Sequence, residues 1–193
     1  MTTRTSARMT ARMTASIPRS VRLVTVLAAS LLVSACGAGA RPAPISSVVP
    51  GPTQAVSASQ AATAVAIDQA LSGVGLRSTP AQLAFRPGES PKLAVAPRTV
   101  VQAVLPNDQT HGMIVIYDFP DAGSALAAGT EMAGYLRSGQ GRIQFLPDAL
   151  FSLRQVGSTV VFFSWSPANS PDPHTADIAT ALQGMGTEIP IGR

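Results

Sequence analysis

Along the last two thirds of the chain, apolar residues recur with the periods of regular secondary structure. These are three to four residues for helices and two residues for strands. Helical spacing predicts three helices, at about 60–73, 121–138 and 173–183. The first has Ser57 or Ser59 as its candidate N-cap, and the last has Asp172. Glycines follow the apolar spacing of each helix, as is typical of helix ends.

Runs rich in β-branched and aromatic residues, separated by turn formers, predict the strands. They are expected at about 98–105 and 113–119, followed by two or three at about 142–146, 149–156 and 158–166, and the segment 81–85 is a further short candidate. The segments 106–112 and 156–158 predict hairpins, so the strands they join are expected to be antiparallel. The fold class that follows is α+β, with an antiparallel sheet of four or five strands and about three helices packed on it.

Both faces of the predicted sheet are apolar. In Met113–Tyr117 and in Val160–Trp165 the two alternating sets of side chains are both mainly hydrophobic, whereas a sheet with one wet face alternates apolar and polar residues. A helix, the 77–97 segment, a partner subunit or an apolar ligand must cover the second face, and cover by the chain's own helices is favoured. If that face is open, Tyr117, Phe162 and Trp165 form the candidate interaction surface for a protein partner or a second copy.

The first 35 residues have the order of a secretory signal peptide. Five arginines and no acidic residue occur in residues 1–22, and an apolar run of 13 residues follows. At ~1.5 Å per residue this run is about 20 Å long, too short for a ~30 Å hydrocarbon core. Residues 36–58, rich in Ala, Pro, Gly and Ser, are expected to be a flexible tether. Residues 59–193 are then one globular domain.

The residues Val33-Ser34-Ala35-Cys36 resemble the lipobox of bacterial lipoproteins, an aliphatic residue and two small residues before an obligatory cysteine. The resemblance implies that the Cys36 thiol takes up a diacylglycerol, that the chain is cleaved before Cys36, and that the new amine is acylated. Two or more acyl chains hold a protein firmly in a membrane. The implied location is the outer face of the cytoplasmic membrane, in the cell envelope. The alternative is a free cysteine after an ordinary signal peptide.

The part from about 64 to 186 is similar to a family of small, uncharacterised bacterial envelope lipoproteins. The similarity lies in three segments: Val115–Ala122, Gly157–Val161 and Ala181–Gly186. It supports the location and the fold, and it implies no catalytic residue. The chain also has 31 Ala, and 13 Arg against one Lys. This composition indicates GC-rich codons and therefore a high-GC bacterium such as an actinobacterium.

Charge and chemistry narrow the function without defining a ligand. From Cys36 onward there are 9 basic and 10 acidic residues, which excludes the basic footprint of a nucleic-acid-binding domain. His111 is expected in an exposed loop. Asp172, His174 and Asp177 have a spacing that could supply metal ligands, but a capping role for Asp172 is the better interpretation.

The chain contains no nucleophile elbow, no His-Glu-x-x-His and no phosphate loop. We therefore expect no catalytic residue, no metal and no cofactor. The sequence favours a lipid-anchored, non-enzymatic binding or accessory module that meets the membrane through Cys36. The alternative is a carrier for a lipid or another apolar envelope molecule.

Overall fold

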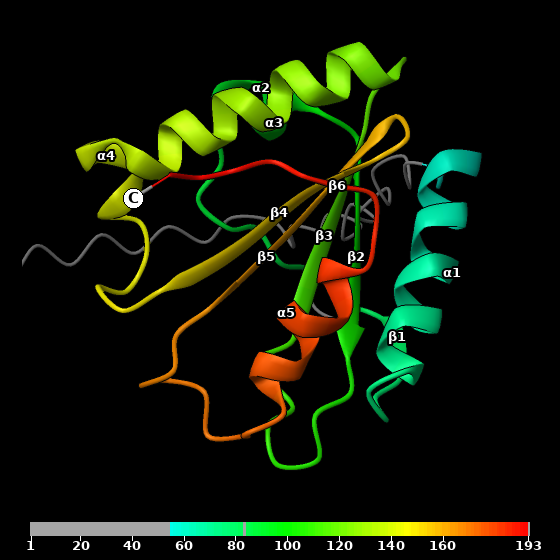
Figure 1. The fold of residues 1–193 in the computed structure, drawn as a ribbon, viewed down its shortest axis with the longest axis vertical. Helices are drawn as coiled ribbons and strands as arrows, with labels where there is room; N and C mark the ends of the chain where they lie inside the picture. Colours follow the sequence, from blue (N-terminus) through cyan, green and yellow to red (C-terminus); the bar gives the residue numbers. More distant parts are fainter. Residues whose placement is uncertain (1–54, 83, 193) are drawn as a thin grey trace, which may run out of the picture. The chain divides into compact units, whose positions relative to one another are not determined.

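The computed structural model describes residues 55–82 and 84–192 of the chain (Figure 1). Its strands form one six-stranded sheet in the order β1-β2-β3-β5-β4-β6, with every neighbouring pair antiparallel. The strands are β1 (Ser78–Pro80), β2 (Arg98–Ala103), β3 (Met113–Asp118), β4 (Leu150–Val156), β5 (Thr159–Trp165) and β6 (Thr187–Glu188). The helices are α1 (Ala58–Ser72), α2 (Pro91–Val95), α3 (Ala122–Arg137), α4 (Gly139–Arg142) and α5 (Thr175–Gln183). The predicted α+β class is confirmed.

Helices of the same chain cover both faces of the sheet, as Figure 1 shows. On one face, α1 and α5 pack side by side, and Ile67 and Leu182 meet Ile116 in one apolar cluster. On the other face, α3 and the 85–97 segment pack on Val115 and Phe162. The two-sided apolar pattern of the strands is therefore explained within the chain.

The first helix is capped as its sequence predicts. The Ser57 hydroxyl accepts the backbone N–H of Gln60 at 3.1 Å, and the Gln60 side chain accepts the backbone N–H of Ser57 at 3.1 Å. This capping box satisfies two N–H groups that a helix start leaves without partners. The helix begins at Ala58, two residues before the expected position.

Two predicted strands are wrong. The described residues of the segment 81–85, all but residue 83, lie outside any strand, and the neighbouring Ser78–Pro80 pairs with β2 instead. In the segment 142–146, Arg142 ends the short helix α4 and residues 143–146 form no strand, because the Ser138 hydroxyl accepts the N–H of Gly141 at 3.0 Å and starts a new helical turn there. A Cβ on Gly141 would overlap the carbonyl oxygen of Tyr135, so glycine permits this tight connection.

The last helix also starts differently from the prediction. It begins at Thr175, with His174 as the capping position and no side-chain cap. The Asp172 carboxylate accepts the N–H groups of Asn107 and His174 instead, at 2.8 and 2.9 Å. Its role is therefore to join the β2–β3 connection to the segment that enters α5.

Candidate functional site

The end of the sheet at which β3 begins and β5 ends carries a pocket of about 320 Å³, which we call the sheet-end pocket. Four segments far apart in the sequence line it: residues 85–88, 110–113, 144–149 and 164–169. Three aromatic and two basic residues are among them: Phe85, Phe145, Trp165, Arg86 and His111. Loops fixed by a rigid scaffold are where binding residues concentrate. This pocket is therefore the candidate functional site.

Two glycines shape the walls of the sheet-end pocket. A Cβ on Gly88 would lie 2.8 Å from the Cβ of Gln144 and 3.1 Å from the ring of Phe145. Glycine at position 88 thus lets the segment 85–88 approach the segment 144–149 closely. Gly112 has a φ of 83°, and a Cβ there would lie 2.7 Å from the carbonyl oxygen of Ala103. Glycine is the residue that adopts this left-handed conformation without strain.

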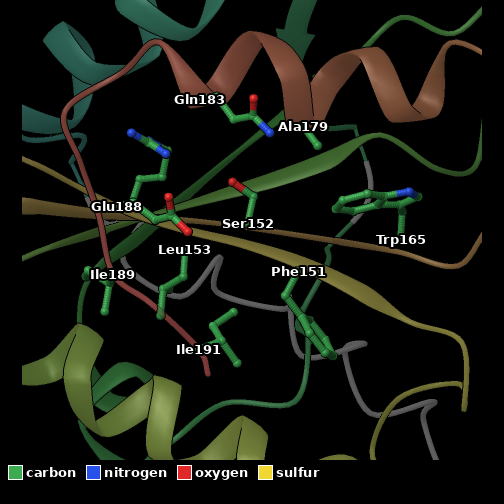
Figure 2. Close-up of a pocket in the computed structure, with 10 residues that line it drawn as sticks. Phe151, Ser152, Leu153, Trp165, Ala179, Gln183, Glu188, Ile189 and Ile191 are labelled. Carbon is green, nitrogen blue, oxygen red and sulfur yellow. The ribbon is translucent and has the colours of Figure 1, made fainter. Parts of the chain in front are cut away.

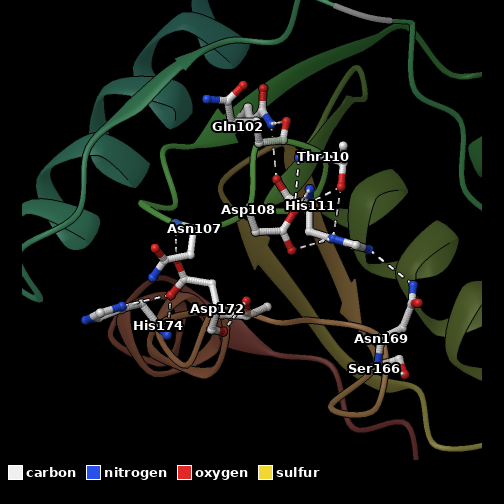
Figure 3. Close-up of polar contacts among 11 residues, drawn as sticks. Gln102, Asn107, Asp108, Thr110, His111, Ser166, Asn169, Asp172 and His174 are labelled. Atoms are coloured by element: carbon white, nitrogen blue, oxygen red, sulfur yellow. Dashed lines mark hydrogen bonds and ion pairs between the residues drawn. The ribbon is translucent and has the colours of Figure 1, made fainter.

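His111 is held at the pocket wall by a buried carboxylate (Figure 3). Its Nδ1 lies 2.5 Å from Oδ2 of Asp108, whose side chain is 3% exposed. The backbone N–H and the hydroxyl of Thr110 also donate to Asp108, at 3.0 and 2.9 Å. Burial alone would raise the pKa of Asp108. The hydrogen bonds from Thr110 and His111 together outweigh burial and lower this pKa below its ordinary value.

An ionised Asp108 fixes how the imidazole of His111 bonds. Because the carboxylate can only accept, Nδ1 carries the proton, and Nε2 of the neutral ring is an acceptor. The side-chain amide of Asn169 lies 3.3 Å from Nε2 and donates to it. His111 is therefore an oriented group at the pocket wall.

Arg86 is anchored at the pocket by a second buried carboxylate. Its Nε donates to Glu89 at 2.8 Å, and its Nη2 donates to the carbonyl of Ala94 at 3.0 Å. The Glu89 side chain is 2% exposed and also accepts the hydroxyl of Tyr117 at 2.7 Å and Nη1 of Arg98 at 3.4 Å. Burial, then the bond to Glu89, raises the pKa of Tyr117 well above its ordinary value, so the phenol remains a donor.

A second aspartate–histidine pair lies at the same end of the sheet but does not line the pocket. Nδ1 of His174 lies 2.8 Å from Oδ1 of Asp172, whose side chain is fully buried. The described residues contain no group of three His, Cys, Asp or Glu side chains placed to hold a metal ion. Asp172 instead joins the β2–β3 connection to the segment before α5, and His174 bonds to the same carboxylate.

A smaller hollow of about 160 Å³ lies along the edge of β4 (Figure 2). Phe151 and Leu153 line it together with Trp165, Glu188 and Ile191. It exists because β6 pairs only with Arg154 and Gln155 of β4. At half the volume of the sheet-end pocket, it is the weaker candidate for a ligand.

The predicted interaction surface is wrong for two of its three residues. Tyr117 and Phe162 are 0% and 1% exposed, because α3 and the 85–97 segment pack on them. Trp165 lies on the opposite face of the sheet, stacked on Phe163 with ring centroids 5.2 Å apart. Of the three, only Trp165 lines the sheet-end pocket. Cys36, the predicted lipid site, lies outside the described residues.

Sequence reasoning missed most of the pocket. Arg86 and Gly88 lie in a proline-rich segment without a clear period, and the sequence pattern places Phe145 in a strand that does not form. The one available signal was the Gly88 position itself, a glycine in a segment that carries an aromatic residue and an arginine.

Comparison of the chain with protein-family models, with curated proteins and with solved structures finds no match. Among the described helices, none is long and apolar enough to cross a membrane. The described part of the chain is thus an α+β domain with helices on each face of its sheet and a pocket at one end.

Proposed function

We propose that this chain is a lipid-anchored binding module of the bacterial cell envelope and that its domain holds a small ligand in the sheet-end pocket without transforming it. The pocket carries the proposal. Its volume of about 320 Å³, its aromatic walls and its few oriented polar groups match small-molecule sites, which begin at ~300 Å³. The anchor rests on the lipobox resemblance at Cys36.

The way the polar groups bond favours binding over catalysis. A nucleophile and its base must share a hydrogen bond. Nε2 of His111 is engaged by Asn169, and the Ser166 hydroxyl donates to Asp148 at 2.7 Å. Among the hydroxyl groups of the described residues, that of Thr110 is the one in contact with His111. It donates its proton to Asp108 and is therefore not placed as a nucleophile with His111 as its base.

The alternative function is a carrier for a lipid or another apolar envelope molecule. The apolar second face of the sheet suggested it, and α3 and the 85–97 segment now account for that face. An acyl chain also needs considerably more room than the sheet-end pocket of about 320 Å³ offers. This pocket therefore fits a compact ligand better than a lipid.

Native mass spectrometry of the full-length protein from its own bacterium tests the proposed binding function. We expect a co-purifying small molecule on the wild type and on His174→Gln, which changes the histidine outside the pocket. Gly88→Val, which fills the pocket at the 2.8 Å contact with Gln144, should lose it. An acyl lipid would support the carrier instead, and an adduct retained by Gly88→Val would contradict the assigned site.

The anchor has its own test. Mass spectrometry of membrane-extracted protein should find an acylated N-terminal peptide that begins at Cys36, and Cys36→Ala should release the protein from the membrane fraction. Recovery of an unmodified Cys36 peptide from the membrane would contradict the lipoprotein assignment.

A further inference from the structure

We infer that the sheet-end pocket selects a small ring-bearing monocarboxylate, with the ring against the aromatic walls and the carboxylate at Arg86. This inference rests on the proposed binding function and adds the chemical class of the ligand. The aromatic walls, the charge of the lining residues and the unused donors of Arg86 carry it.

The aromatic walls are rigid and favour a ring. Phe145 packs edge-on against Phe151 with ring centroids 4.9 Å apart, and Trp165 is stacked on Phe163 at an interplanar angle of 11°. Because these neighbours hold Phe145 and Trp165 in place, a ligand meets surfaces that lose little freedom on binding. Rings bind such surfaces by stacked or edge-on contact.

The charges at the pocket favour an anion. Every residue that lines it lies in the described part of the chain, and none of these lining residues is Asp or Glu. Arg86 is the permanent cation among them. The carboxylate behind it, Glu89, also contacts Arg98, so two guanidinium groups and one carboxylate leave this wall with a net charge of about +1. The carboxylates of Asp108 and Asp148 lie behind His111 and Ser166 at other walls, so an anion is directed to Arg86.

Arg86 has donors left for a ligand. Nε and Nη2 bond to Glu89 and to the carbonyl of Ala94, whereas Nη1 donates to no other described residue. A guanidinium fixed on one side and open on another is suited to a carboxylate, because charge-assisted N–H···O⁻ bonds are the strong ones. An ammonium ligand would need an acceptor such as Nε2 of His111, but this atom already bonds to the side-chain amide of Asn169.

Three probes with one skeleton test the ligand class: 3-phenylpropionate, 3-phenylpropylamine and 3-phenylpropan-1-ol. Each is titrated into the full-length, detergent-solubilised, ¹⁵N-labelled protein, and the amide signals of Gly88 and Gly112 are followed by NMR. We expect the acid to shift both signals saturably and with a Kd about tenfold lower than those of the amine and the alcohol, as one charge-assisted bond provides.

Matched variants assign the preference to Arg86. Arg86→Gln should make the acid and the alcohol bind equally, and Arg86→Lys should keep part of the preference. Arg77→Gln, an exposed arginine that does not line the pocket, should leave all three affinities unchanged.

Two results would overturn the inference, and they differ in what they leave standing. If the wild type binds the amine or the alcohol as tightly as the acid, the ligand class is wrong but the pocket still binds. If no probe shifts Gly88 or Gly112 while native mass spectrometry finds a pocket ligand, the ring-bearing class is also wrong. A silent titration without any co-purifying ligand contradicts the proposed function itself.

Discussion

At the scale of single residues, carboxylates hold the loops at the pocket end of the sheet, the exposed Asp148 and the buried Asp172 among them. Asp148 accepts the backbone N–H of Ala168 and the hydroxyl of Ser166, and Asp172 accepts two backbone N–H groups from separate segments. The N–H of Ala168 is the main cause that lowers the pKa of Asp148, and that of Asn107 is the main cause for Asp172. The ionised forms therefore stabilise the folded state.

The lowered pKa of Asp172 predicts an acid-sensitive connection. A carboxyl whose pKa is lower in the folded state contributes stability above its unfolded pKa, ~3.9, and loses it as the pH falls through the folded value. Asp172→Asn should therefore lower the unfolding temperature at pH 7, and the difference from wild type should shrink below pH ~4. Thermal unfolding by circular dichroism at several pH values measures this.

Asp177→Asn is the control for that prediction, because the Asp177 carboxylate accepts no hydrogen bond from another described residue. It should leave the pH dependence of the unfolding temperature unchanged. A loss for Asp172→Asn that stays constant down to pH 2 would show that the ionised carboxylate is not what matters.

At the scale of elements, the spacing of apolar residues in the sequence locates the helices and strands that pack along most of their length. The four central strands and the helices α1, α3 and α5 start and end within about two residues of their predicted positions. The errors at 81–85 and 142–146 have a different origin. There a side chain such as Ser138, or pairing with a distant strand, decides the local structure, and neither leaves a periodic pattern.

A close contact between α3 and the chain end gives a prediction for one helix position. A Cβ on Gly129 would overlap Cδ1 of the buried Ile189. Gly129→Ala should therefore cost about 1–3 kcal/mol of unfolding free energy through overpacking, although alanine is the better helix former. Ile189→Val removes Cδ1, so adding Gly129→Ala in that background should be neutral or stabilising. Urea unfolding measures all variants.

Gly134→Ala on the same helix is the matched control. Nothing lies within 4 Å of the Cβ that it adds, so it should stabilise the protein by up to about 1 kcal/mol. Equal effects at Gly129 and Gly134 would contradict the packing argument.

At the scale of the whole molecule, the site was beyond sequence reasoning for a physical reason. Phe85, His111, Phe145 and Trp165 come from four segments, and only the antiparallel order of the sheet brings them to one end. The local sequence pattern of a single segment does not indicate which other segments lie beside it in the fold. The apolar second face, by contrast, was visible in the strands, and its favoured cover by the chain's own helices is what the structure shows.

The boundary of the folded unit yields the last prediction. Among the described residues, its first stabilising contacts are the capping box at Ser57 and the bond from the Ser59 hydroxyl to Asp118 at 2.6 Å. The sequence predicts a tether before this point, so deletion of residues 41–50 from the full-length protein should leave the unfolding temperature unchanged. Ser57→Ala should lower the unfolding free energy by about 0.5–2 kcal/mol, because a helix N–H then loses its acceptor. Differential scanning calorimetry compares the two. A deletion that destabilises as much as Ser57→Ala would mean that the tether packs on the domain and that the folded unit begins before residue 55.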